Sequence, residues 1–180
     1  MINAWWAANR ALGRASVLFA YAIGKAQRLL AGVDPSIGPI IVHGAVARFL
    51  PAYEAAGVRL APAEHGDSDR IRRERGRALV IAPPSAVGSP WLRKLGEVST
   101  AFASGWMQIR GTRRRRNLDR GFVLSDHADW NDLLETIRES GAETVGVTHG
   151  YAHVLARWLE EQGKTARVVA THFEGESAED

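Results

Sequence analysis

Two histidines, each following a short apolar run, are the residues of this chain whose types and spacing best suit chemistry. His127 follows Phe-Val-Leu and is flanked by Asp126 and Asp129, whereas His149 follows Val-Gly-Val. An imidazole beside carboxylates can transfer a proton near neutral pH, and a neutral imidazole can also ligate a metal. The pair therefore predicts an acid–base or metal site. The alternative is that each histidine caps a strand or bonds a buried carbonyl.

Each of these histidines is predicted to stand between a strand and a helix. Asp129 occupies the position of an N-cap before one amphipathic helix, which Gly141 should end. A second amphipathic helix should begin at Tyr151 and end at Gly163. Because the carboxyl ends of parallel strands meet at one edge of an open sheet, we expect both imidazoles at that edge.

The rest of the chain repeats this alternation of strands and helices, which predicts an α/β fold with a mostly parallel, three-layer sheet. We expect strands at residues 16–21, 40–42, 78–82, 98–103, 122–124, 145–147 and 168–170. Helices are expected at 3–12, from Gly24, through Phe49 and Tyr53, and from Pro90. Residues 57–76 should form a polar loop with one exposed helical turn.

Two further residues at strand ends could serve a site or only the fold. Lys25, at the start of the helix after Gly24, could hold a phosphate, although a glycine that allows close packing is the simpler explanation. His43 follows the strand at 40–42 and has no acidic neighbours, which favours a structural role.

The composition is that of a globular protein, because 46% of the 180 residues are hydrophobic and 24% are charged. The absence of cysteine excludes disulfides and cysteine-based zinc sites, and it fits a cytoplasmic location. The apolar run at 16–21 is too short to span a membrane, and no small-residue cleavage site follows it.

The net charge is only +3, yet the basic residues are concentrated in runs. A second group of arginines lies between residues 70 and 77, and the main run consists of Arg113, Arg114, Arg115 and Arg116. Such runs suit the phosphate backbone of a nucleic acid, although a basic run in a polar loop can also be merely solvated. Residues 174–180 form an acidic tail that we expect to be disordered.

Several motifs carry a resemblance to a known family. The ordered set is SVLFAYAIGKAQRLL at 16–30, IVHGAV at 41–46, IAPPSAVGSPW at 81–91, ASGWMQIRGTRRRR at 103–116, then SDHADW and VTHGY. This set resembles the ligase-associated DNA exonucleases of bacteria, which belong to the β-CASP branch of the metallo-β-lactamase fold nucleases. The likeness covers nearly the whole chain.

The resemblance implies roles for the two histidines. His127 would contact the scissile phosphate and act as a general acid, and His149 would ligate an active-site metal. From their positions on either side of His127, Asp126 and Asp129 could keep its imidazolium charged. Two zinc or manganese ions would activate water and stabilise the leaving oxygen. Most ligands in this family come from an H-x-H-x-D-H motif, which does not occur among the six histidines here. The chain is therefore expected to be the C-terminal half of a longer enzyme, inactive alone.

The resemblance also implies a domain layout and partners. Residues 1–117 would be an incomplete β-CASP part, 118–173 the C-terminal portion of the metallo-β-lactamase domain, and 174–180 the tail. The partner would be DNA, as single strands or ends, with functional association to a DNA ligase and no membrane. The residues expected to contact the DNA are Lys25, Arg113, Arg114, Arg115 and Arg116. An RNA-processing nuclease fragment and a non-catalytic nucleic-acid-binding remnant remain open alternatives.

Overall fold

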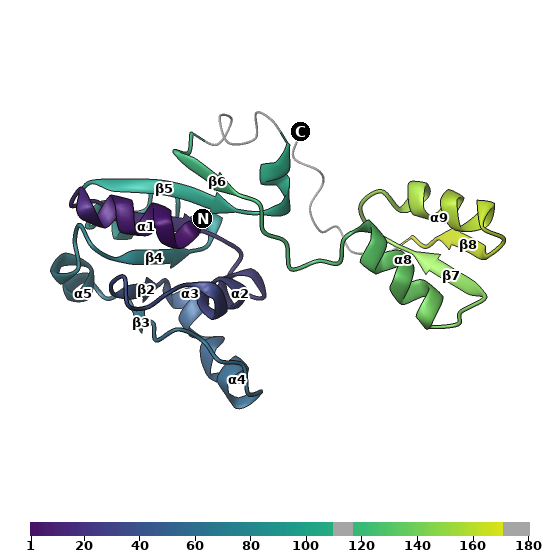
Figure 1. Cartoon of the computed structure of the whole chain (residues 1–180), viewed down its shortest axis with the longest axis horizontal. Helices are drawn as coiled ribbons and strands as arrows, with labels where there is room; N and C mark the ends of the chain where they lie inside the picture. Colours follow the sequence, from purple (N-terminus) through teal and green to yellow (C-terminus); the bar gives the residue numbers. More distant parts are fainter. Residues whose placement is uncertain (110–116, 171–180) are drawn as a thin grey trace. The chain divides into compact units, whose positions relative to one another are not determined.

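The computed structural model describes residues 1–109 and 117–170, which belong to two compact units (Figure 1). The first unit runs from Met1 to Asp126, and the second begins at His127. No helix among the described residues is long and apolar enough to span a bilayer.

Part of the predicted DNA-binding surface falls outside the described residues. The acidic tail at 174–180 lies outside them, and so do the four arginines of the predicted run, Arg113, Arg114, Arg115 and Arg116. Their contact with DNA therefore stays a prediction.

The first unit contains a six-stranded sheet in the order β3-β2-β4-β1-β5-β6, with every neighbouring pair parallel. Its strands are β1 (Ala15–Phe19), β2 (Ile40–Val42), β3 (Glu64–His65), β4 (Leu79–Ala82), β5 (Val98–Ala103) and β6 (Arg120–Phe122). Its helices are α1 (Ile2–Ala11), α2 (Lys25–Gly32), α3 (Gly44–Ala47), α4 (Leu50–Ala55), α5 (Ser68–Arg73) and α6 (Pro90–Arg93), with short 3₁₀ turns η1 (Pro84–Ala86) and η2 (Gly105–Gln108). The predicted α/β class with a parallel sheet is confirmed.

Helices cover both faces of this sheet because the central strands are apolar on both sides. Leu18 and Ile81 belong to one buried cluster, which α1 and α2 cover with Trp6 and Leu30. Val17 belongs to the other, which α5, α6 and η1 cover. Alternate residues of one strand thus enter opposite layers, as the two-residue period requires. The three-layer arrangement follows from this alternation.

The second unit contains a two-stranded parallel sheet of β7 (Thr144–Val147) and β8 (Thr165–Val168) with α8 (Trp130–Glu139) and α9 (Ala152–Glu161). Its small core centres on Leu159, which is 1% exposed. Gly141 and Gly163 follow α8 and α9 with φ of 66° and 80°, a left-handed conformation that ends helices. Both predicted helix ends are confirmed.

Three local predictions need correction. The last strand begins at Thr165 instead of Val168, since Ala166 is the residue that its small core buries. The strand expected at 122–124 is Arg120–Phe122, because backbone pairing with β5 sets its limits. The region 57–76 contains the unexpected β3. It also contains α5, which buries Ile71 completely and is therefore no mere exposed turn.

The predicted common sheet edge for the two histidines is wrong. The strand before His127 is β6, which belongs to the six-stranded sheet, whereas His149 follows β7 of the two-stranded sheet. The two compact units meet at 126/127, because β6 pairs with β5. The predicted domain layout, with its boundary at 117/118, stays a prediction. The identity of the two parts as β-CASP and metallo-β-lactamase remains a prediction.

Candidate functional site

The first part of the candidate site lies at the start of α2, which follows the carboxyl end of β1. Gly24 is the N-cap of α2 and has φ 77°, a conformation that L side chains rarely adopt. A methyl group at this position would lie 2.5 Å from Oδ2 of Asp126. Glycine is therefore required here both by the backbone conformation and by the close approach of Asp126.

Lys25, predicted to contact DNA, lies inside the first unit. Its Nζ forms an ion pair with Oδ1 of Asp126 at 3.1 Å, and the two side chains are 5% and 24% exposed. The ammonium also lies 4.8 Å from the centre of the Tyr21 ring, within range of a cation–π interaction. The structure thus brings together two predicted site residues that are distant in sequence. The contact of Lys25 with DNA stays a prediction, and it would require this pair to open.

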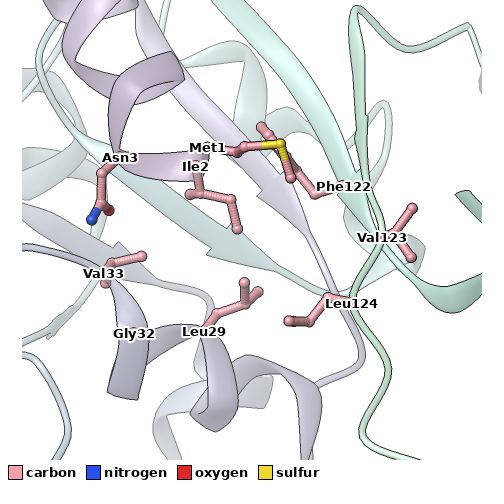
Figure 2. Close-up of a pocket in the computed structure, with 9 residues that line it drawn as sticks. All are labelled: Met1, Ile2, Asn3, Leu29, Gly32, Val33, Phe122, Val123 and Leu124. Carbon is pink, nitrogen blue, oxygen red and sulfur yellow. The ribbon is translucent and has the colours of Figure 1, made fainter. Parts of the chain in front are cut away.

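The segment before Asp126 is also held by α2. The Arg28 guanidinium donates a hydrogen bond to the backbone carbonyl of Ser125. Leu124 is partly buried against the core cluster that contains Leu29. A pocket of about 270 Å³ lies beside this contact. Ile2, Leu29 and Leu124 point into it (Figure 2). The chain leading to His127 therefore runs along α2.

His127 and Asp129 open the second unit and are both exposed. Oδ1 of Asp129 accepts a hydrogen bond from the backbone N–H of Asp132 at 3.0 Å, which makes Asp129 the N-cap of α8. Its predicted capping role is confirmed. This N-cap bond engages one oxygen of the Asp129 carboxylate. An interaction of Asp129 with His127 would therefore use the hydrogen-bond acceptor sites that the N-cap bond leaves open.

His149 stands in an unusual backbone conformation at the turn between β7 and α9. Its φ is 63°, and the following Gly150 has φ 57°. A left-handed non-glycine residue costs about 1–2 kcal/mol, so such outliers concentrate at functional sites. Nδ1 of His149 lies 3.0 Å from Oγ1 of Thr148. If Nδ1 donates to Thr148, Nε2 keeps its lone pair and has the form that a metal ligand needs.

The described residues do not form a complete metal centre. Within residues 1–109 and 117–170, no three His, Cys, Asp or Glu side chains are grouped closely enough to hold a metal ion. His149 therefore fits a metal as a single ligand, and a two-metal site would need ligands from elsewhere. The assignments of His127 and His149 stay predictions.

The arginines between residues 70 and 77 are largely engaged by acids and carbonyls of the first unit. Arg70 and Arg77 both contact Glu74, which is 6% exposed. Arg72 pairs with Asp69, and Arg75 donates to the carbonyl of Lys94. These guanidinium groups mainly stabilise the region around α5, which weakens the case for this run as a phosphate-binding surface.

The contacts that surround His43 were only partly predicted from the sequence. His43 is the N-cap of α3, since its Nδ1 accepts from the backbone N–H of Ala45 at 3.1 Å. Its ring meets that of Trp91 edge to face, with centroids 5.1 Å apart. Partial burial, and secondarily the nearby His65, lower the pKa of His43. The structural role favoured for His43 fits these contacts. His65 was missed because it belongs to β3, a strand of two residues that is too short to show a period.

Comparison with known proteins finds a likeness to part of one larger protein. No protein-family model matches the chain. It is 33% identical over 150 residues to a protein of Opitutus terrae named "Probable DNA ligase". The alignment covers 83% of this chain but only 14% of that protein, so this chain is similar to one region of a much larger polypeptide.

Proposed function

We propose that this chain is the C-terminal part of a metal-dependent exonuclease that hydrolyses DNA phosphodiester bonds and works with a DNA ligase. The observation that carries the proposal is the similarity, over 83% of the chain, to a protein named as a DNA ligase. That name favours DNA over RNA as the substrate. The reaction class rests on the resemblance of SDHADW and VTHGY to the last two nuclease motifs.

The geometry at His149 supports the proposed reaction class. A histidine in a costly left-handed conformation, with one ring nitrogen beside a threonine hydroxyl, suits a side chain whose other nitrogen must point in a fixed direction. Within the proposal, His149 holds one metal ion, which supplies Lewis-acid chemistry when bound. His127 donates a proton to the leaving oxygen, which its exposed position permits.

The exposed apolar surface of the second unit supports completion by further polypeptide. No residue of α8 is buried, although Trp130 and Leu133 lie on its apolar face. Val154 of α9 is 57% exposed. Among the described residues, β7 and β8 pair only with each other, and a two-stranded sheet is seldom stable without more packing. Additional strands carrying the missing ligands would cover this surface.

The proposal is tested by comparing this chain with the polypeptide encoded when the reading frame is extended upstream of Met1. Both are loaded with zinc or manganese and assayed on end-labelled DNA and on RNA of the same sequence. We expect chelator-sensitive release of nucleotides from DNA by the extended polypeptide, and neither turnover nor stoichiometric metal for this chain alone.

Three outcomes would contradict the proposal. Selective hydrolysis of RNA would identify an RNA-processing enzyme. Binding of DNA without hydrolysis by the extended polypeptide would identify a non-catalytic module. Chelator-sensitive hydrolysis by this chain alone would show that its own residues complete the site.

A further inference from the structure

One face of α2 contacts the segment that leads into His127. Lys25, Arg28, Leu29 and Gly32 are spaced at i, i+3, i+4 and i+7, which places them on a single side of the helix. Each has a partner or neighbour in residues 122–126. Lys25 pairs with Asp126, Arg28 bonds the Ser125 carbonyl, and Leu29 and Gly32 line the pocket with Phe122, Val123 and Leu124.

The polar half of this contact includes an ion pair in which Lys25 is buried and Asp126 is partly exposed. The Lys25 side chain is 5% exposed, and its charge is balanced by Asp126 at 3.1 Å. Without Asp126, the buried Lys25 ammonium would lose its counter-ion, and without Lys25, the partly exposed Asp126 carboxylate would lose the cation that holds it at the start of α2. Gly24 permits this approach, because any side chain there would meet Asp126. The pair therefore fixes the last residue before His127.

We propose that Lys25 is a positioning residue for His127, acting by clamping Asp126 to the start of α2. The proposal rests on the proposed function, in which His127 transfers a proton during hydrolysis. Lys25 then acts through Asp126 on the chain position from which His127 acts, and it does not itself touch the substrate. The GKAQ segment at residues 24–27 would then hold another part of the chain in place instead of binding a phosphate.

The first experiment uses this chain and requires no catalysis. Backbone ¹⁵N order parameters are measured for the wild type, for Lys25→Met, and for the exchanged pair Lys25→Glu with Asp126→Lys. We expect the order parameters of Ser125 and Asp126 to be about 0.85 in the wild type and below about 0.6 in Lys25→Met. The exchanged pair should restore much of the order, since it recreates the ion pair. Lys25→Met keeps most of the aliphatic stem, so the core should remain filled.

The matched control is Arg14→Met, which removes a cation from the exposed Arg14–Glu97 pair of the same unit. It should leave the order parameters of residues 125 and 126 unchanged. If Lys25→Met also leaves them unchanged, even with lower overall stability, Lys25 is only a core residue and the proposal is overturned.

The second experiment measures turnover in the upstream-extended polypeptide. Lys25→Met should lower kcat about 10- to 100-fold while KM and metal content stay at wild-type values, because only the placement of a catalytic group has changed. A wild-type kcat for Lys25→Met would overturn the positioning role. An inactive wild type would instead refute the proposed function, and the order parameters would still decide whether the clamp exists.

Discussion

Nδ1 of His149 lies 3.0 Å from Oγ1 of Thr148, so the hydroxyl of one residue is within hydrogen-bond distance of the imidazole of the next. His149 makes this contact with a left-handed φ of 63°. Groups that fix the orientation of a ligating imidazole commonly affect metal affinity about 10- to 100-fold. This relationship leads to a prediction about metal binding.

In the upstream-extended polypeptide, Thr148→Val should weaken metal binding about 10- to 100-fold, and His149→Ala should lower metal content and activity together. His127→Ala should retain the metal and lower turnover about 10²- to 10⁴-fold, as expected for loss of a general acid. Metal analysis and kinetics on the same preparations test this division.

A substrate whose leaving group needs no proton, such as p-nitrophenolate, separates these roles further. It should rescue much of the His127→Ala loss and none of the His149→Ala loss. Equal loss of metal in both variants, or no rescue, would contradict the assignment.

Asp129 has a structural role that can be separated from a catalytic one. Asp129→Ala should destabilise the second unit by about 1 kcal/mol, because α8 loses its N-cap. Asp129→Ser should preserve stability, since serine also caps well, while removing the carboxylate near His127. Urea unfolding of this chain measures the first effect.

Turnover of the extended polypeptide measures whether the Asp129 carboxylate acts in the reaction. If Asp129→Ser is stable but slow, the carboxylate acts in the reaction. If its turnover equals that of the wild type, Asp129 serves only the helix and its predicted catalytic role is wrong.

The arginine run is expected to contribute affinity for DNA without sequence preference. Its members are Arg113, Arg114, Arg115 and Arg116. Replacing all four with alanine should reduce the slope of log K against log salt by up to about 2.8 for single-stranded DNA, at ~0.7 per phosphate contact. Binding of a labelled oligonucleotide across a salt series measures the slope.

A matched control for this run replaces four arginines that are paired with acids. Arg14, Arg72, Arg138 and Arg157 each form an ion pair at the surface. Their joint replacement by alanine removes the same charge but should change the salt slope much less. Equal slopes for the two quadruple variants would show that only net charge matters.

The lowered pKa of His43 predicts that the free energy of unfolding depends on pH. Its pKa in the folded chain is lowered from 6.5 by partial burial and by the nearby His65, so the unfolded chain binds more protons there. The contribution of His43 to the free energy of unfolding is therefore fully present above about pH 6.5, and it is lost as the pH falls through the pKa of His43 in the folded chain. One such group contributes at most about 1.4 kcal/mol per pH unit to the slope.

His43→Asn tests this dependence because asparagine can still cap α3 but does not titrate. The variant should show a flatter decline of unfolding free energy as the pH falls below about 6.5, measured by urea unfolding. An identical decline in variant and wild type would show that other groups cause it.

The sequence alone determined the elements whose signals are local. The strand at residues 40–42 and that at 98–103 occur as predicted, because β-branched and aromatic residues are frequent in both segments and suit strands. The limits of α8 were also readable, since an N-capping Asp129 and a helix-ending Gly141 act within a few residues of the helix they bound.

Only the tertiary structure decided how distant segments combine. The apolar run before His127 looked equivalent to the run before His149, yet backbone pairing places the corresponding strands in different sheets. Lys25 looked available to a phosphate, but the burial of its side chain against Asp126 depends on residues that only folding brings together. Periodicity and caps report short-range preferences, whereas strand partners and ion pairs depend on the free energy of the whole packed unit.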